Sequence, residues 1–536
     1  MNDIRLNVEQ VEADVLCIGG GPAGLCAAIR ASEQGAEVVV VDKSHTLRSG
    51  DAGMGNDHFM CHIPDVQGER PDFFNKMGNM SQVVTKTFWE NAYGLVKLWD
   101  SWGIPMKYEG RYEFAGHSIP GQPNFMLHFS GQNTKVKLTK QAKKAGVNII
   151  NRVMILDLIH DNGTIAGAIG FDVRKPRLLV FKTKAVILGT GKCMRLFPQN
   201  TGSLFNTSTS PVNTGDGRAM AYRAGCELSD MELNNRWSGP KYFARNGRGS
   251  WTGVFRDPHG MQICSGKELT AHFYPELHED YQKSGRGPVY MDLAGISDEH
   301  YEDMKYWLIH EANTPILNFF KEEGVDPREH PFEFMTYGLF TPGGINYNEK
   351  CETPLSGLYA AGDEFMSFYL AGAAVFGSIA GESAAKFAAQ AKASDIEGAQ
   401  ALVGKVKELL EAVLNRTDGA TWQEANSAIQ QVMADYCGLI RSETLLTAGL
   451  EHLRRLKKKV PEVLMAQNPH ELMRCIEVLN LFDLGEITFV AAKERKESRQ
   501  YHRRVDFPFT NPILNEQMLV VKNENGQPVP KWRMKA

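Results

Sequence analysis

Three glycines and one acidic residue carry the clearest chemical signal in this sequence. Gly19, Gly21 and Gly24 stand between a short apolar run and a helical pattern, and Asp42 ends the next apolar run. In this order the first glycine makes a tight turn, the second lets the backbone approach a pyrophosphate, and the third allows close packing of helix on strand. The acid can accept hydrogen bonds from both hydroxyls of a ribose. The spacing therefore predicts a dinucleotide-binding site.

Regular elements must hold these residues in place. Residues 15–18 are expected to form a buried parallel strand, residues 22–34 the following helix and residues 38–41 the next strand. Residues 147–188 contain alternating and β-branched runs interrupted by Asn162-Gly163, the pair typical of a type I′ hairpin turn. We therefore expect a β-meander before the chain returns to the sheet.

Two segments far along the chain decide between NAD and FAD. Residues 185–192, AVILGTGK, read as a strand that stops in a glycine turn, and residues 357–365, GLYAAGDEF, as a strand that ends in Gly-Asp. An NAD domain has no use for the second segment, whereas FAD is long enough to reach its carboxylate and backbone N–H groups. Together with the first glycine loop, these segments resemble flavoproteins with two dinucleotide-binding motifs. FAD is the expected cofactor.

The pattern of periodicity divides the chain into several parts. Between residues 232 and 333 it becomes poor, with aromatic residues, glycines and arginines interleaved, and after residue 381 apolar residues recur at helical spacing. We expect an α/β fold with an FAD-binding doubly wound domain, its β-meander, an inserted α+β cap domain and a C-terminal helical domain. The expected boundaries are 1–231 and 334–394 for the two parts of the FAD-binding domain, 232–333 for the cap domain, 395–500 for the helical domain and 501–536 for a C-terminal tail.

Composition excludes several functional classes. The 536 residues carry a net charge of −4, which argues against a general nucleic-acid binder. Nine cysteines are scattered without a CxxC pair, so no metal site and no iron–sulfur cluster held by a cysteine run is expected in this chain. No apolar run approaches the roughly 18 residues that span a membrane, and no secretory signal is visible. A cytoplasmic protein is expected, with any membrane association made through a complex.

Longer motifs point to a family. The chain resembles the succinate dehydrogenase/fumarate reductase flavoprotein superfamily over essentially its whole length. The matching motifs are the opening GGGPAG, RSG at 48–50, GPVYMDL at 287–293, TPGGINYN at 341–348, GLYAAGD at 357–363 and the arginine-rich ESRQYHRRVDFP at 497–508. The segments GAIGFDVRKPRLLVFKTKAVILGTG and NPHELMRCIEVLNL look most like the alpha subunit of adenylylsulfate reductase. The resemblance implies FAD, a cap domain, a helical domain and a ferredoxin-type iron–sulfur partner protein.

The resemblance also implies which residues hold the cofactor. Some members attach FAD covalently to a histidine directly after the RS pair; because Gly50 stands there, we expect non-covalent FAD, and we interpret His45 as a loop histidine. The expected cofactor-binding residues are Gly19, Gly21, Pro22, Ala23, Gly24, Asp42, Lys43, Arg48, Ser49, Gly50, Met154, Thr190, Gly191, Gly362, Asp363, Ala373 and Ala374.

The substrate side departs from the family pattern. The histidine of the family's HxTxGG motif, which binds a dicarboxylate, aligns with Leu339, and the catalytic arginine falls within residues 364–373, which contain no arginine. The residues of the adenylylsulfate pocket align near Met60, Ser208, Gly239 and Gly338. A dicarboxylate needs cationic groups, and a sulfonucleotide needs a stacking aromatic ring and an anion site. Succinate, fumarate and adenylylsulfate are therefore poor substrate candidates.

Three residues are the catalytic candidates, each with a structural alternative. His58 could act as acid or base, or be satisfied by backbone groups. Arg256 lies in a cap segment of interleaved cations and aromatic residues that suits either an anionic substrate or a partner surface. Tyr369 could donate a proton or simply pack. The basic run at 452–463 is either a solvated helix face or a docking site for an acidic ferredoxin-type subunit.

Three functions fit these observations. The first is an FAD-dependent oxidoreductase subunit that exchanges electrons between an organic or sulfur-containing substrate and an iron–sulfur partner protein. The second is an electron-transfer subunit, relay or bifurcating, without a substrate of its own. The third is a stand-alone FAD ene-reductase; if it used NAD(P)H it would need a second nucleotide fold, and no second GxGxxG follows a strand.

Overall fold

A seven-stranded sheet forms the centre of the molecule. The computed structural model describes residues 4–70, 81–114, 124–198, 204–205, 207, 209–240, 254–263, 281, 284–310, 314–365, 368–392, 396 and 399–535. The sheet has the order β6-β2-β1-β9-β8-β7, and β16 also pairs with β9. Its strands are β1 (Asn7–Ile18), β2 (Val38–Asp42), β6 (Asn148–Asn151), β7 (Val153–Asp161), β8 (Thr164–Asp172), β9 (Arg177–Leu188) and β16 (Leu358–Ala360).

The parallel part of this sheet agrees with the predicted doubly wound domain. β1 pairs in parallel with β2 and β9, β2 pairs with β6, and β16 pairs with β9. The β-meander is also confirmed, since β7, β8 and β9 are consecutive antiparallel strands. Asn162 and Gly163 join β7 to β8 with φ of +47° and +78°, the two positive values that a type I′ turn requires.

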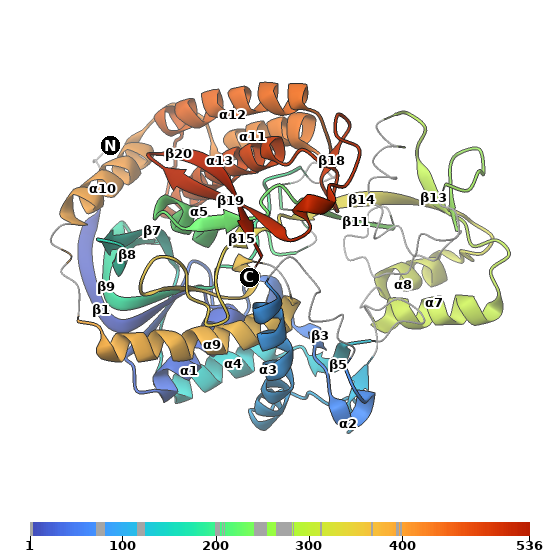
Figure 1. The fold of residues 1–536 in the computed structure, drawn as a ribbon, viewed down its shortest axis with the longest axis horizontal. Coiled ribbons are helices and arrows are strands. Elements are labelled where there is room, and N and C mark those ends of the chain that lie inside the picture. Colours follow the sequence, from blue (N-terminus) through green and yellow to red (C-terminus); the bar gives the residue numbers. More distant parts are fainter. Residues whose placement is uncertain are drawn as a thin grey trace.

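Three helices lie along one side of the sheet: α1 (Pro22–Glu33), α4 (Thr134–Lys144) and α9 (Tyr369–Gln390) (Figure 1). α1 and α9 run in the same direction and touch through their backbones. A Cβ on Gly377 would overlap the carbonyl oxygen of Ala23, and one on Gly381 would overlap that of Ala27. Because only glycine allows this approach, both helices can direct their N-termini toward the same end of the sheet.

A second, smaller sheet with its own core forms the lobe on the right of Figure 1. Its strand order is β11-β14-β13-β12, and helices α7 and α8 accompany it. The bounds are β11 (Asn235–Pro240), β12 (Phe255–Arg256), β13 (Val289–Met291), β14 (Phe332–Phe340), α7 (Asp298–His310) and α8 (Thr314–Glu323). β14 crosses the predicted boundary at residue 333, because this strand both completes the lobe and leads back to the FAD-binding domain.

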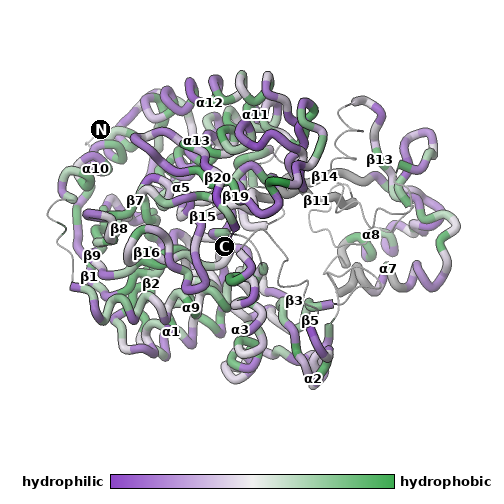
Figure 2. The backbone as a smooth tube through the Cα atoms, in the orientation of Figure 1, coloured by the Kyte–Doolittle hydropathy of each residue, from purple (hydrophilic) through white to green (hydrophobic). Residues whose placement is uncertain are grey.

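Four helices and a hairpin make the C-terminal part. The helices are α10 (Gln400–Asn415), α11 (Trp422–Cys437), α12 (Glu443–Val463) and α13 (Pro469–Glu494), with strands β17 (Ile440–Arg441) and β18 (Arg503–Arg504) and the 3-10 turn η5 (Pro512–Leu514). α13 is buried on nearly all sides, whereas the outer helix α12 carries long hydrophilic stretches (Figure 2). The hairpin of β19 (Gln517–Glu524) and β20 (Gln527–Met534) pairs with β10 (Glu227–Ser229), which in turn pairs with β15 (Gly344–Ile345).

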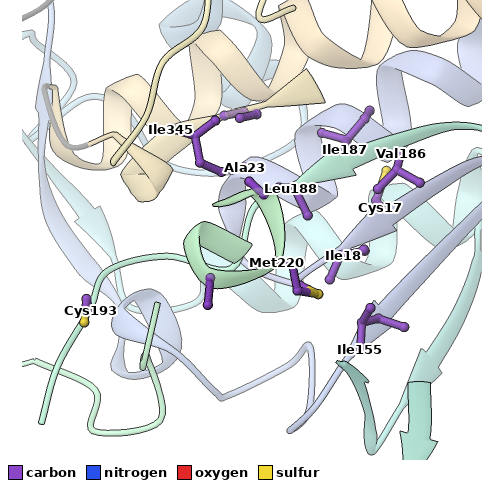
Figure 3. Packing of buried hydrophobic residues seen from close by; sticks show 14 of the residues in the cluster. Cys17, Ile18, Ala23, Ile155, Val186, Ile187, Leu188, Cys193, Met220 and Ile345 are labelled. Atoms are coloured by element: carbon purple, nitrogen blue, oxygen red, sulfur yellow. The ribbon is translucent and has the colours of Figure 1, made fainter. Parts of the chain in front are cut away.

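The remaining elements lie beside the end of the central sheet. β3 (Asn56–Met60), β5 (Met126–Gly131) and β4 (Glu113–Phe114) form a three-stranded sheet next to α2 (Pro64–Gln67) and α3 (Gln82–Ser101), and α5 (Asp216–Arg223) stands over β7. Figure 3 shows Ile18 and Leu188, the last residues of β1 and β9, in the core beside Met220 of α5. None of the helices that the structure describes is long and apolar enough to cross a membrane.

Candidate cofactor site

The glycine loop after β1 has the geometry of an anion site. Gly19 has a φ of +106°, and a Cβ on it would overlap the carbonyl oxygen of Gly189; a Cβ on Gly24 would overlap that of Gly19. A Cβ on Gly21 would meet only the Gly189 oxygen, at 4.0 Å. α1 begins at Pro22 with no acid in its first turn and no side-chain cap. The N–H groups of this turn therefore face room for a pyrophosphate, which fits FAD.

Asp42 holds the same loop from the end of β2. Its Oδ2 accepts the N–H of Gly20 at 2.8 Å, and its Oδ1 accepts the N–H of Ser44 at 2.7 Å. An ionised carboxylate has about four acceptor positions. Two remain for ribose hydroxyls, so the predicted contact is compatible with the geometry and stays a prediction.

The turn after β9 is tied to the turn after β16. The N–H and the hydroxyl of Thr190 both donate to Oε1 of Glu364 at 2.6 Å, and Glu364 ends the 3-10 turn η3 (Gly362–Glu364). Glu364 is fully buried, and burial raises the pKa of its carboxyl to about 7 although Thr190 and Arg218 oppose the shift. Thr190, Gly191, Gly362 and Asp363 are thus brought together, as a single cofactor site requires.

A charged cluster that the sequence did not reveal lies where three of these segments meet. Nζ of Lys192 lies 3.0 Å from Oδ2 of Asp51 and 3.7 Å from Oδ2 of Asp363. Burial disfavours the lysine charge, but the two carboxylates outweigh it and raise the pKa of Lys192. Burial raises the pKa of the Asp363 carboxyl, and Lys192 opposes that shift. The available signal was that both Lys192 and Asp363 directly follow the glycine turn that ends a strand.

Gly50 lies in the turn before the 3-10 helix η1 (Asp51–Met54), and its φ is +76°. This backbone conformation favours glycine and is strained for a histidine. The neighbouring predicted residues are held by the start of α4. The Arg48 guanidinium donates to the carbonyl of Gln132 at 3.2 Å and to Oδ1 of Asn133 at 3.0 Å. The ammonium of Lys135 donates to the carbonyl of Ser49 at 2.5 Å.

Lys43 has other partners than the sequence suggests. Its ammonium group donates to Oδ2 of Asp216 at 2.6 Å and to Oε1 of Glu477 at 2.8 Å. Arg195 binds the other oxygen of Glu477 at 2.6 Å. Burial would raise the pKa of Glu477, but Lys43, Arg195 and Arg474 lower it to about 2. Lys43 thus joins β2 to α5 and α13, and its predicted contact with the cofactor stays a prediction.

The start of α9 lies beside the turn of Gly362. A Cβ on Gly362 would lie 3.1 Å from Cβ of Ala23 and 3.2 Å from Cα of Ala373, so α1, η3 and the second turn of α9, which also contains Ala374, meet at one point. Tyr369, the first residue of α9, has a φ of +50°, which is uncommon for a side chain of this size. Such strained residues cluster at functional sites. Met154 is buried in β7 opposite Phe171.

His58 belongs to a row of titratable groups across the three-stranded sheet. In the register of this sheet His58 faces His128, and His128 faces Glu113. The two histidine rings lie 5.5 Å apart, and Nδ1 of His128 lies 2.7 Å from Oε2 of Glu113. Nδ1 of His58 lies 3.0 Å from Oδ1 of Asp57. The row could pass protons between solvent and His58.

Arg256 lies on a different sheet from the cofactor segments. It stands in β12 opposite Tyr290 of β13, and its guanidinium donates to the carbonyl of Phe255 at 3.1 Å. Residues 241–253, in the cap segment around it, and Ser208 lie outside the described residues. Its role as a catalytic residue stays a prediction, as do those of His58 and Tyr369.

Two family comparisons cover most of the chain. Residues 14–374 match the FAD binding domain family, and residues 426–529 match the family described as fumarate reductase flavoprotein C-term. Similar proteins include a chain of the fumarate reductase (CoM/CoB) of Methanothermobacter marburgensis, 24% identical over 97% of this chain and 99% of that protein. The fumarate reductase flavoprotein subunit of Escherichia coli is 23% identical over 93% of this chain and 89% of that protein.

Solved structures show the same fold. Adenylylsulfate reductase from Archaeoglobus fulgidus superposes with a TM-score of 0.81 at 23% identity, covering 99% of this chain and 96% of that chain. A quinol-fumarate reductase solved with menaquinol molecules superposes with a TM-score of 0.80 at 20% identity, covering 98% of this chain and 98% of that chain. Both likenesses extend over the FAD-binding domain, the second lobe and the helical part.

Proposed function

The chain belongs to the FAD-binding flavoprotein family that includes the fumarate reductase flavoproteins, and from this premise we propose the kinds of molecule between which it transfers electrons. It is an FAD-dependent oxidoreductase. We propose that it is the flavoprotein subunit of a complex and exchanges electrons between an organic or sulfur-containing substrate and an iron–sulfur partner protein. The partner and the substrate class are the parts that go beyond family membership.

The observation that carries the proposal is the meeting of Asp51, Lys192 and Asp363 beside the N-termini of α1 and α9. When bound, FAD supplies hydride and single-electron chemistry. The first turn of α1 would bind the pyrophosphate, and Asp42 and Asp363 would accept hydrogen bonds from ribose and ribityl hydroxyls. Lys192 and the N-terminus of α9 present positive charge at the same end of the sheet. This chain therefore has the residues to hold FAD, and the ammonium of Lys192 offsets the negative charge of the two carboxylates beside it.

Protons would pass along the row of Glu113, His128 and His58. Nδ1 of His128 is within hydrogen-bond distance of Glu113, and the half-buried Asp57 lies beside His58. We propose His58 as the acid or base and His128 as the residue that connects it to Glu113. Tyr369 is the alternative proton donor from the α9 side.

The lack of cationic residues at the start of α9 limits which substrates we propose. Residues 364–374 contain no lysine or arginine, although this is where relatives with dicarboxylate substrates carry an arginine. An anionic substrate would depend on cations of the second lobe such as Arg256. We therefore propose that the substrate is neither fumarate nor adenylylsulfate. The same feature favours the second candidate function, an electron-transfer subunit without a substrate of its own.

The experiment is an anaerobic reoxidation assay. The purified flavoprotein is reduced chemically and mixed with fumarate, with adenylylsulfate, with an artificial dye, or with the iron–sulfur protein that co-purifies with it. We expect rapid electron transfer to the dye and the iron–sulfur protein and slow reoxidation by the first two compounds. Rapid reoxidation by fumarate or adenylylsulfate would overturn the substrate proposal. Steady oxidation of NADH by the isolated chain would favour a stand-alone reductase.

A further inference from the structure

An apolar surface lies on the segment that follows α13. Val505, Phe509 and Ile513 are 62%, 55% and 75% exposed, and Leu445 in the first turn of α12 is 42% exposed. The segment touches that turn, because the N–H of Glu443 donates to Oδ2 of Asp506 at 2.8 Å. Thus 4 of the 13 exposed large apolar side chains among the described residues belong to this one region. Such a concentration is typical of an interaction surface.

These side chains are exposed on a backbone that is firmly held. The buried Arg504 donates to the carbonyl of Ala492 at 3.0 Å and to both carboxylate oxygens of Asp506 at 2.8 Å. Glu497, fully enclosed, accepts the N–H of Asn511 at 2.8 Å, and the hydroxyl of Thr510 donates to the carbonyl of Ser498 at 2.7 Å. A partner that binds here would lose little entropy in ordering the segment.

The charge around this surface is positive. Lys496 and Arg503 are exposed, and neither forms an ion pair within the described part of the chain. Two of the three acids between residues 495 and 516 are already used, because Glu497 binds Arg495 and Arg499, and Asp506 binds Arg504; the third, Glu516, is exposed. An apolar centre with a cationic rim suits an acidic protein with an apolar patch.

The basic run on α12 offers less charge than its sequence suggests. Arg454 binds Glu486 at 2.7 Å, and Lys457 binds Asp483 at 2.7 Å, both on α13. These two cations serve the packing of α12 on α13. Arg455 and Lys458 of the same run stay exposed without an ion pair among the described residues, but no exposed large apolar side chain lies between residues 452 and 463. The segment after α13 is therefore the better candidate for a partner surface, because it combines cations with apolar side chains.

We propose that the surface formed by Leu445, Val505, Phe509 and Ile513, with Lys496 and Arg503 at its rim, docks an acidic iron–sulfur protein. This inference rests on the proposed function, which supplies such a partner, and assigns it a place on the chain. The apolar residues provide the buried centre of the interface. The two cations steer the acidic partner and make the association sensitive to salt.

The test compares matched surface variants. The chain, with its FAD, is purified from its native host at low salt, and the co-purifying protein that contains iron and acid-labile sulfide is identified and used as the probe. Its Kd is measured by calorimetry against each variant. For Phe509→Glu/Ile513→Glu we expect Kd to rise at least tenfold. For Lys496→Glu/Arg503→Glu we expect weaker binding with a flatter salt dependence.

Val83→Glu/Leu98→Glu is the matched control, because it places acids on exposed apolar positions of α3, and it should bind like the wild type. FAD content reports that each variant is folded. An unchanged Kd for Phe509→Glu/Ile513→Glu overturns the docking surface and leaves the proposed function standing. If no iron–sulfur protein accompanies the wild-type chain, the proposed function fails and this inference with it. A wild-type dimer that Phe509→Glu/Ile513→Glu dissociates would instead assign the surface to a second copy of the chain and overturn the proposal.

Discussion

Nζ of Lys192 lies 3.0 Å from Oδ2 of Asp51, and this contact joins the turn after β9 to the turn after Gly50. Removal of the ammonium group leaves Asp51 and Asp363 uncompensated at the proposed FAD site. We expect Lys192→Met to make the reduction potential of bound FAD more negative by on the order of 30–60 mV, which corresponds to about 1.4–2.8 kcal/mol for two electrons. Lys192→Arg should retain most of the wild-type potential. Dye-coupled redox titration measures both, and an unchanged potential in fully loaded Lys192→Met would contradict this role.

Gly21→Val should abolish FAD binding. The valine side chain would occupy the room that faces the first turn of α1, where the pyrophosphate is expected. Gly94→Val is the control, since Gly94 lies on α3 with no atom within 4 Å of an added Cβ. The ratio of flavin absorbance to protein absorbance measures the outcome. Full loading of Gly21→Val would refute the assignment of this loop.

Introducing a histidine at position 50 should not create a covalent flavin. The φ of +76° at Gly50 disfavours a side chain, so Gly50→His is expected to shift the backbone rather than to place an imidazole at a flavin. Acid precipitation of the wild type and of Gly50→His should leave all yellow colour in the supernatant. Flavin fluorescence on the protein band of a denaturing gel would show the opposite.

The buried His502 should make the protein less stable in mild acid. Its Nδ1 accepts from Arg441 at 2.6 Å and its Nε2 donates to the carbonyl of Arg495 at 3.0 Å, so the ring is neutral. Burial and the nearby Arg441 place its pKa well below the ordinary value of 6.5. The unfolded chain therefore binds an extra proton below about pH 6.5, and stability falls as pH decreases.

This histidine effect is measured as the slope of Tm against pH between about 5 and 7, the range in which an unperturbed histidine titrates. We expect a smaller slope in His502→Gln and an unchanged slope in His160→Gln, where the histidine is exposed. An equal slope in all three proteins would contradict the assignment.

The buried Glu364 should have the opposite effect and make the protein less stable as the pH rises. Burial raises the pKa of its carboxyl to about 7 from 4.5, so the folded protein holds an extra proton between these values. Its contribution is fully present below about pH 4.5 and is lost as pH rises through about 7, on the order of 3 kcal/mol in total. Denaturant titrations of Glu364→Gln should show no such loss of stability as the pH rises. Glu516→Gln, which changes an exposed residue, should show the same loss as the wild type. A loss that persists in Glu364→Gln would assign it to another group.

Local patterns were sufficient to predict the conformation of the glycine loop and the place of Asp42. The positions of Gly19, Gly24 and Asp42 follow from one strand, one helix and the next strand, and the Asn162-Gly163 turn follows from its own two residues. Asn525 and Gly526, with φ of +54° and +80°, carry the same turn signal between β19 and β20. Within the segment that we expected to be a C-terminal tail, this turn joins two paired strands.

Contacts between distant segments could not be read from one sequence. Lys43 was predicted at the cofactor, yet its partner Glu477 lies on α13, and no local pattern relates the two. The arginine-rich segment after α13 gives no local sign of its partners either. Arg495 is buried between Glu232 and Glu497, because the segment folds back beneath the helical domain.

The backbone contact of Gly377 with Ala23 has a consequence for how the protein is made. Ribosomes add roughly 5–20 residues per second, so α9 emerges roughly 20–70 s after the glycine loop that it must support. During that time β1 first lacks its neighbour β9, and β9 then lacks its neighbour β16. FAD therefore has no complete site on the nascent chain until the sequence is about two-thirds translated. Loading of the cofactor is a late event in biosynthesis, and a cell short of FAD would accumulate full-length chains without the cofactor.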